Sequence, residues 1–266
     1  MGLQTEGKYT RILNARCIGD TRRCRWTALG RGSMCQTMFA IDERGRGFTW
    51  GQNYAGTQGH GDPDWISSMN WTYPDLVDIE FATQLLPNSG PWVKSDAGEY
   101  CGMIMNASGE IYIFGENMIV NDNACRAPGS PGVDYEWWTP IRVAPGMTFK
   151  DFSFDYYHAH GVNQNNRLVS WGYNINYCMG NGLPECQWSA YLEGRVYTPY
   201  ENPLMVEDVK LVACEYGGDA CVTVSNRVYG WGENWYEGAM WSQVPVEYTG
   251  LPEIHIPQSG LLLHYF

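Results

Sequence analysis

The chain has 266 residues and a formal net charge of −12; 17% of its residues are charged, 14% are aromatic and 31 are glycine. This acidic balance argues against binding to nucleic acid, because that binding needs basic groups to displace counterions from phosphates. No apolar run is long enough to cross a membrane, and the first ten residues lack the apolar segment of a secretory signal, so we expect synthesis in the cytoplasm without membrane insertion.

The first 46 residues are basic although the chain as a whole is acidic. They contain nine Lys or Arg and four Asp or Glu, whereas residues 47–266 contain eight and 25. These basic side chains can neutralise acidic loops of the same chain, or they can form a docking patch for an acidic partner. We favour the first of these interpretations.

One arrangement of strands is expected four times along the chain. Glycine and proline mark turns, while tryptophan, tyrosine, phenylalanine and valine favour strands, so the composition indicates an all-β fold. Each copy begins with a hairpin of two apolar strands, and the four hairpins span 26–42, 93–109, 149–165 and 209–225. A third strand follows and ends on an aromatic residue and a glycine, at Trp50-Gly51, Phe114-Gly115, Trp171-Gly172 and Trp231-Gly232.

A proline is expected to open the outer, last strand of each copy, because no ladder donor is lost at that position. The four outer strands would read YPDLVDIE, TPIRVAP, NPLMVEDV and VPVEYT. The aromatic-glycine pairs are separated by 64, 57 and 60 residues. Four short strands repeated at this period, with aromatic signatures, are typical of the blades of a β-propeller.

The two ends of the chain are expected to form a fifth, partial blade. Residues 8–13 resemble the outer strand that precedes each hairpin, and residues 251–266 supply a hairpin without another Trp-Gly strand. Because open sheet edges invite aggregation, the two ends should pair and close the ring, with Phe266 ordered in the closing strand. We therefore predict a single domain over residues 1–266, a small all-β propeller of about five blades, with four as the alternative and seven disfavoured.

The repeat resembles that of the regulator of chromosome condensation family. Residues 50–61 meet the motif W-G-x-N-x-x-G-x-x-G-x-G, and residues 177–182 repeat its downstream glycines. This resemblance implies a β-propeller fold and a structural role for His158, which lies where the repeat has a histidine. It also implies two functions: guanine-nucleotide exchange on a small GTPase, and enzyme inhibition of the kind shown by a similar secreted propeller that blocks β-lactamases.

The sequence shows no recognisable catalytic or metal-binding motif. His158 and His160 lie two residues apart on one strand and face the same side, but no third ligand at metal-site spacing stands beside them. Asp62, Asp64 and residues 121–123 offer oxygen atoms without the pattern of a calcium loop. We therefore expect no enzyme, no metal and no cofactor, and a lyase or glycosidase built on paired carboxylates is the least favoured hypothesis.

Nine cysteines are many for a chain without a secretory signal. None has the spacing of a zinc knuckle. We expect most of them to be buried free thiols, because the chain shows no route to an oxidising compartment. A disulfide between Cys178 and Cys186 is the favoured exception.

Long segments rich in aromatic residues are inserted between the third and the outer strands. Because they leave equivalent positions of successive blades, they should emerge on one face of the propeller. Tryptophan and tyrosine dominate binding hot spots, although these rings could instead cap the blades. The interface candidates are Trp65, Trp71, Tyr73, Tyr135, Trp137, Trp138, Trp188, Tyr191, Tyr197, Trp235 and Tyr236.

Together these features predict a non-catalytic protein–protein interaction module. It would bind protein partners through its aromatic loop face and serve as a structural component of a larger assembly, such as a viral or phage particle. The alternatives are a guanine-nucleotide exchange factor for a small GTPase and a proteinaceous enzyme inhibitor.

Overall fold

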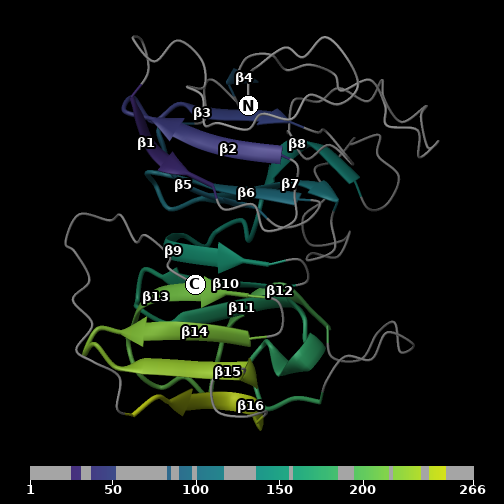
Figure 1. Cartoon of the computed structure of the whole chain (residues 1–266), viewed down its shortest axis with the longest axis vertical. Helices are drawn as coiled ribbons and strands as arrows, with labels where there is room; N and C mark the ends of the chain where they lie inside the picture. Colours follow the sequence, from purple (N-terminus) through teal and green to yellow (C-terminus); the bar gives the residue numbers. More distant parts are fainter. Residues whose placement is uncertain are drawn as a thin grey trace, which may run out of the picture. The chain divides into compact units, whose positions relative to one another are not determined.

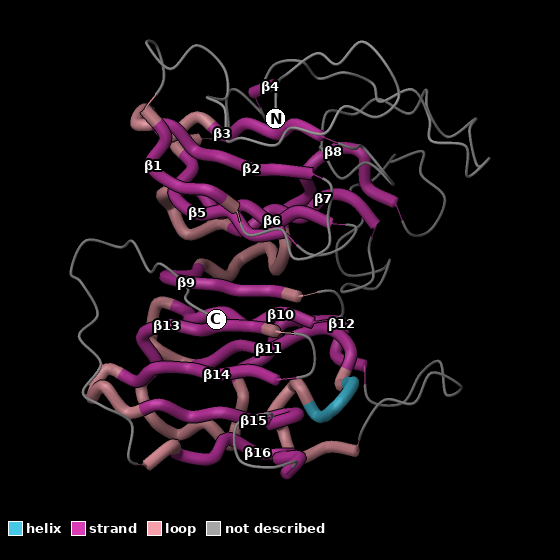
Figure 2. Tube along the Cα trace, in the orientation of Figure 1, coloured by secondary structure: helices cyan, strands magenta, loops and turns pink. Residues whose placement is uncertain are grey.

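The structure is a computed structural model, and it describes residues 25–30, 37–51, 83–84, 90–97, 101–116, 136–155, 158–184, 195–215, 218–234 and 240–249. In these residues the secondary structure consists of strands β1 to β16 and one short 3₁₀ turn, η3 (Ile175–Tyr177). Figure 1 shows neighbouring strands side by side within each sheet, and Figure 2 shows η3 as the helical segment. No helix in this part of the chain has the length and apolar character needed to cross a membrane.

The strands form four antiparallel sheets of four strands each, and each sheet is ordered along the sequence or in reverse. The first sheet contains β1 (Trp26–Leu29), β2 (Thr37–Asp42), β3 (Gly47–Gly51) and β4 (Thr83–Gln84). The second contains β5 (Trp92–Ala97), β6 (Cys101–Asn106), β7 (Ile111–Glu116) and β8 (Glu136–Arg142). The third contains β9 (Phe149–Phe154), β10 (His158–Asn163), β11 (Leu168–Tyr173) and β12 (Arg195–Glu201). The fourth contains β13 (Val209–Cys214), β14 (Gly218–Thr223), β15 (Val228–Asn234) and β16 (Met240–Glu247).

The chain divides into two compact units. The first unit contains β1 to β8, and the second comprises residues 150–153 and 158–266. Each unit has its own apolar core. The core of the first contains Phe39, Ile41, Trp92, Ile104 and Phe114. The core of the second contains Val162, Leu168, Met205, Val209, Val212, Cys221 and Trp231.

The predicted hairpins and third strands are confirmed in all four copies. In the last three copies the ladder between the third and outer strands shifts register at the aromatic residue, so Phe114, Trp171 and Trp231 each lie at a β-bulge. The glycine that follows has a positive φ, of 98°, 112° and 79° respectively. Glycine adopts this conformation without steric cost, which explains why the aromatic residue is followed by glycine.

The predicted outer strands are wrong in their boundaries. Pro140 lies inside β8 and Pro199 inside β12, and residues 202–208, predicted as strand, follow the end of β12. Each of these prolines lies on the last strand of its sheet, where a missing N–H donor is tolerated at interior positions as well as at the first residue. Pro140 thus lies in the outer strand without opening it, and Pro203, which was predicted to open the third outer strand, lies after the end of β12. The first predicted outer strand, YPDLVDIE, lies outside the described residues.

The turn between the second and third strands has the same construction in all four sheets. Its first residue accepts backbone N–H groups on a side-chain oxygen; in the second sheet Asn106 Oδ1 accepts from Ser108 at 3.0 Å and from Glu110 at 2.9 Å. The fourth residue of the turn has a positive φ in every copy. The first residues are Asp42, Asn106, Asn163 and Thr223, and the fourth are Gly45, Gly109, Asn166 and Asn226.

Asp42 is the charged member of this set, and its turn should depend on pH. Burial by itself raises the pKa of Asp42, but the amide and guanidinium of Arg46 and the amide of Arg44 outweigh burial and hold the pKa below its ordinary value of 3.8. Because the pKa of Asp42 is lower in the folded than in the unfolded chain, its ionised form stabilises the fold at pH values above the unfolded pKa. This stabilisation is lost as the pH falls through the folded pKa.

Asp42→Asn should therefore cost up to about 1 kcal/mol of unfolding free energy at pH 7 and less at pH 3. Asparagine suits this turn, as Asn106 and Asn163 occupy the same place, so the change removes mainly the charge facing Arg46. Urea denaturation of both proteins at the two pH values measures the difference. An equal cost at both pH values would contradict the role given to the carboxylate.

The predicted fifth blade is not tested by the structure. Residues 8–13 and 251–266, including Phe266, lie outside the described residues. Closure of the ring by the two ends of the chain, and the single domain that it implies, stay predictions.

Candidate functional site

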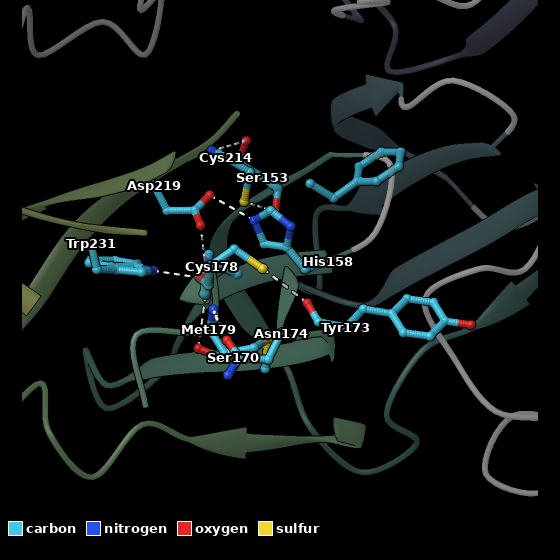
Figure 3. Close-up of polar contacts among 12 residues, drawn as sticks. Ser153, His158, Ser170, Tyr173, Asn174, Cys178, Met179, Cys214, Asp219 and Trp231 are labelled. Carbon is cyan, nitrogen blue, oxygen red and sulfur yellow. Dashed lines mark hydrogen bonds and ion pairs between the residues drawn. The ribbon is translucent and has the colours of Figure 1, made fainter. Parts of the chain in front are cut away.

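A cluster of titratable side chains is buried between the two sheets of the second unit (Figure 3). His158 and His160 come from β10, Cys214 from the end of β13 and Asp219 from β14. The side chains of both histidines and of Asp219 are at most 2% exposed. The two histidines face the same side of β10, as the sequence predicts.

His158 forms an ion pair with Asp219. The His158 Nε2 lies 2.8 Å from Asp219 Oδ1, and Figure 3 shows the carboxylate directed at the imidazole. Burial by itself lowers the pKa of His158, but the Asp219 carboxylate outweighs burial and raises the pKa well above its ordinary value of 6.5. Burial also works against the Asp219 charge, yet the facing His158 keeps the pKa of Asp219 below its ordinary value. Both groups are therefore charged at neutral pH.

His160 is held at both ring nitrogens. Its Nδ1 lies 2.8 Å from Ser170 Oγ, and its Nε2 lies 2.9 Å from the Cys178 carbonyl and 3.6 Å from Asp219 Oδ2. A carbonyl oxygen only accepts hydrogen bonds, so His160 Nε2 carries the proton. Trp231 Nε1 donates to the same carbonyl at 2.6 Å, and its ring meets the His160 ring edge to face with centroids 5.1 Å apart.

The loop after β11 presents the Cys178 carbonyl to these two donors. It follows the third Trp-Gly pair, and Asn174, the asparagine of the W-G-x-N motif, accepts the Met179 N–H at 3.0 Å and donates to the Pro184 carbonyl at 2.9 Å. Gly180 has a φ of 54°, and a Cβ there would lie 2.7 Å from the Trp231 ring. The asparagine and glycine of the motif therefore place this loop against Trp231.

Cys178 is a free, buried thiol, so the predicted disulfide with Cys186 is wrong. Its Sγ–H donates to the Tyr173 carbonyl at 2.9 Å, which satisfies the thiol inside the loop instead. Burial raises the pKa of the Cys178 thiol, and this disfavours the thiolate that a nucleophile needs. Cys101, Cys214 and Cys221 are also buried thiols outside any disulfide, which confirms the prediction for these cysteines.

The cluster contains the third metal ligand that the sequence did not reveal. One ligand atom from each of His158, His160, Cys214 and Asp219 lies within 4.8 Å of the others. Asp219 follows His158 by 61 residues, one repeat later, and lies on the neighbouring sheet. The signal that could have found it is the repeat itself: ligands for a histidine of one blade can be sought one period further along the chain.

Three of the eleven predicted interface residues lie in strands of the structure and not in loops. Trp137 and Trp138 belong to β8, and Tyr197 belongs to β12, because these outer strands begin earlier than predicted. The other eight lie outside the described residues: Trp65, Trp71, Tyr73, Tyr135, Trp188, Tyr191, Trp235 and Tyr236. Their gathering on one face stays a prediction.

Three exposed apolar residues of the second unit lie at or near Gly182. Leu183, Leu204 and Val244 are 49%, 43% and 40% exposed. A Cβ built on Gly182 would lie 3.1 Å from Leu204 Cδ1 and 3.8 Å from Val244 Cγ1, and the Gly182 N–H donates to the Gln243 carbonyl at 2.8 Å. We call these three side chains the Gly182 patch.

Comparison with solved structures identifies the fold, although no protein-family model matches the sequence. Human WBSCR16 is 16% identical with a TM-score of 0.64, over 86% of this chain and 54% of that chain. Yeast RCC1 (Prp20), solved with Kap60 bound, is 15% identical with a TM-score of 0.63, over 87% and 51% of the two chains. Prp20p from Saccharomyces cerevisiae is 17% identical with a TM-score of 0.62, over 85% and 50%.

The fold is that of an RCC1-type β-propeller. The resemblance seen in the Trp-Gly repeats is thus confirmed at the level of fold, and the predicted all-β propeller class with it. The chain spans about half the length of the solved structures it matches. At 15–17% identity the likeness carries no residue roles from those proteins to this one.

Proposed function

We propose that the chain is a non-catalytic protein-interaction module and a building block of a larger assembly. The observation that carries this proposal is the Gly182 patch, where the exposed side chains of Leu204 and Val244 approach Gly182 and the exposed Leu183 follows it in the chain. Contiguous apolar surface is unfavourable in water and commonly marks a place where a protein partner binds. The backbone beneath it is tied into β16 through Gly182 and Gln243, so the patch is preorganised for docking.

The buried cluster supports the same function. His158, Asp219 and Cys178 would be the natural acid, base and nucleophile of an enzyme, but all three are sealed from solvent. A reacting group must come within hydrogen-bond reach of a substrate, which this burial prevents. The polar groups instead connect the two sheets that carry the exposed surface.

The solved structures of similar fold support a protein partner in general terms. Yeast RCC1 (Prp20) was solved bound to Kap60, and Prp20p from Saccharomyces cerevisiae is described with its binding properties to Gsp1p and histones. A propeller of this type therefore serves as a protein-binding scaffold in those proteins. We extend the proposal to the aromatic segments, because tryptophan and tyrosine are the residues that dominate binding hot spots.

A double variant of the patch tests the proposal. Leu183→Ser with Leu204→Ser should weaken binding to the native partner at least about tenfold, because interface residues that matter cost more than about 1 kcal/mol when truncated. The partner is identified by cross-linking and mass spectrometry of the assembly purified from the native source, and a viral or phage particle is one expected assembly. Binding is then measured with the purified partner.

Val224→Ser is the matched control, since Val224 is 54% exposed on the turn after β14, away from the patch residues in sequence. The control should bind as the wild-type chain does, and all three proteins should melt at the same temperature. Unchanged binding by the double variant, or equal losses in the double variant and the control, would refute the role of the patch.

Guanine-nucleotide exchange is the second candidate function. The specific observation in its favour is the fold shared with Prp20p, a protein described as binding Gsp1p. Exchange works by stabilising a nucleotide-free GTPase, so it needs no catalytic motif. A complex that forms with a small GTPase after nucleotide removal, and dissociates when GTP is added, would favour this candidate over the building block.

A further inference from the structure

The strongest unexplained feature of the molecule is the convergence of four metal-ligating side chains in the second unit. Their ligand atoms, two imidazole nitrogens, one thiol sulfur and one carboxylate oxygen, lie within 4.8 Å of one another. Zinc bonds of about 2.0–2.3 Å in tetrahedral geometry place ligand atoms about 3.3–3.6 Å apart. Small side-chain adjustments therefore bring this set to the size of a zinc site.

A second observation at the same place points to a cation. The Oδ2 atom of Asp219 is buried without a hydrogen-bond partner, and His160 Nε2 lies 3.6 Å away. A buried carboxylate oxygen left in this state costs free energy, since its hydration is lost and not replaced. A metal ion bound between Asp219 and His160 would supply the missing partner.

The packing of the sheets does not by itself require these polar groups. In the first unit Phe39 pairs with Thr49, and in the second unit His160 pairs with Ser170. Phe39 and His160 therefore occupy equivalent positions of their sheets. Phe39 packs against Phe114 with ring centroids 5.5 Å apart, as His160 packs against Trp231. The fold thus fills the equivalent position with two phenylalanines in one unit and with the cluster in the other.

The residue opposite the aromatic ring also differs between the two units. Gly102 lies opposite Phe114, and a Cβ there would lie 2.6 Å from the Phe114 ring and 2.7 Å from the Phe39 ring. Asp219 takes this ladder position opposite Trp231. The carboxylate therefore stands where the first unit has no side chain at all, and its presence calls for a role beyond packing.

The groups around the cluster orient the ligands as outer-shell groups do in metal sites. Ser170 Oγ lies 2.8 Å from His160 Nδ1, which leaves Nε2 of this ring directed at the cluster. Ser153 Oγ accepts the Cys214 N–H at 3.1 Å, and the Cys214 thiol donates to the Ser153 carbonyl at 3.0 Å. Second partners of this kind fix ring orientation and commonly accompany metal ligands.

We propose that His158, His160, Cys214 and Asp219 bind one zinc ion that joins the two sheets of the second unit. Two neutral imidazoles, one thiolate and one carboxylate balance the two charges of the ion, so the buried site is neutral. Binding releases the Cys214 thiol proton and the Nε2 proton of the charged His158. His160 stays neutral because its proton moves from Nε2 to Nδ1, where Ser170 Oγ accepts it. The Cys178 carbonyl keeps its hydrogen bond from Trp231. Four protein ligands leave no open position, so this zinc is structural and not catalytic.

Refolding of the full chain tests the proposal, because a sealed site takes up its ion most readily as the chain folds. The denatured protein is refolded with zinc or with a chelator, dialysed and analysed for bound metal. One zinc per chain and a higher melting temperature are expected after refolding with zinc. In the Cys214→Ser variant the zinc content should fall to a trace, while Cys221→Ser, a buried thiol outside the ligand set, should retain one zinc.

A cobalt spectrum of the wild-type chain keeps the test independent of how the variants fold. Cobalt bound in place of zinc should show the visible bands of tetrahedral cobalt and a thiolate-to-cobalt charge-transfer band. In a separate measurement, the Ser170→Ala variant should bind zinc about 10–100-fold more weakly than the wild-type chain. Less than stoichiometric zinc in the wild-type chain would overturn the proposal. A cobalt spectrum without thiolate character, or equal zinc in the Cys214→Ser and Cys221→Ser proteins, would overturn it too.

Discussion

Replacing Trp231 with alanine is expected to lower the free energy of unfolding by about 3–5 kcal/mol. The Trp231 side chain is 2% exposed and packs against Gly180 and the His160 ring. Alanine would leave a cavity between the two sheets and remove the N–H donor to the Cys178 carbonyl. Urea denaturation followed by far-ultraviolet circular dichroism measures the loss, because this signal comes mainly from the backbone of the sheets.

Trp231→Phe is the matched control for this prediction. Phe114 occupies the same place in the second sheet, so a phenyl ring suits the bulge and fills most of the space. The Cys178 carbonyl keeps the His160 hydrogen bond in this variant, so the loss of stability should be clearly smaller than for alanine. Equal losses for the two variants would show that packing against Gly180 and His160 contributes little.

Asp219→Asn is expected to cost about 3–5 kcal/mol at neutral pH, because it leaves the buried, charged His158 without its partner. The measurement is made in the presence of a chelator, so that it reports the ion pair and not a bound metal. Asparagine keeps the size of the side chain. The loss is therefore electrostatic and does not come from a cavity.

The pH dependence of this cost follows from the two pKa shifts. The raised pKa of His158 stabilises the fold below the unfolded value of 6.5, and this contribution is lost as the pH rises through the folded pKa. The lowered pKa of Asp219 stabilises the fold above its unfolded value, and this contribution is lost as the pH falls through the folded pKa. The cost of Asp219→Asn should therefore be largest between the two folded pKa values.

A double-mutant cycle with His158→Gln separates the pair from its surroundings. If the two side chains act together, the double variant should lose less stability than the sum of the single variants, because no buried charge is left unpaired. Strict additivity would mean that His158 and Asp219 stabilise the fold independently. That result would also remove the physical reason for the raised pKa of His158.

Local signals predicted the inner part of each sheet well and the outer part poorly. The hairpins and the third strands have apolar residues, turn residues and a Trp-Gly bulge that can be recognised within a few positions of one another. The outer strands follow long insertions, and Pro140 and Pro199 mark an edge without marking where the strand starts. No short turn connects β7 to β8 or β11 to β12, so the start of each of these outer strands is decided by its pairing with the third strand and not by a nearby turn signal.

The sequence predicted two of the four residues of the candidate site. His158 and His160 share one strand, and their spacing alone places them on the same face. Cys214 and Asp219 belong to the next repeat, and no rule of local spacing connects them to the histidines. The aromatic candidates remain predictions about a binding face, because most of them lie outside the described residues.

The sequence by itself determined that this chain is built from repeated four-stranded sheets, because strand, turn and bulge are set by contacts between residues close together in the chain. Only the tertiary structure decided that one pair of sheets meets through phenylalanines and another through two histidines, a cysteine and an aspartate. The physical reason is that burial and charge pairing are properties of neighbours in space. Here those neighbours are up to one repeat, 61 residues, apart.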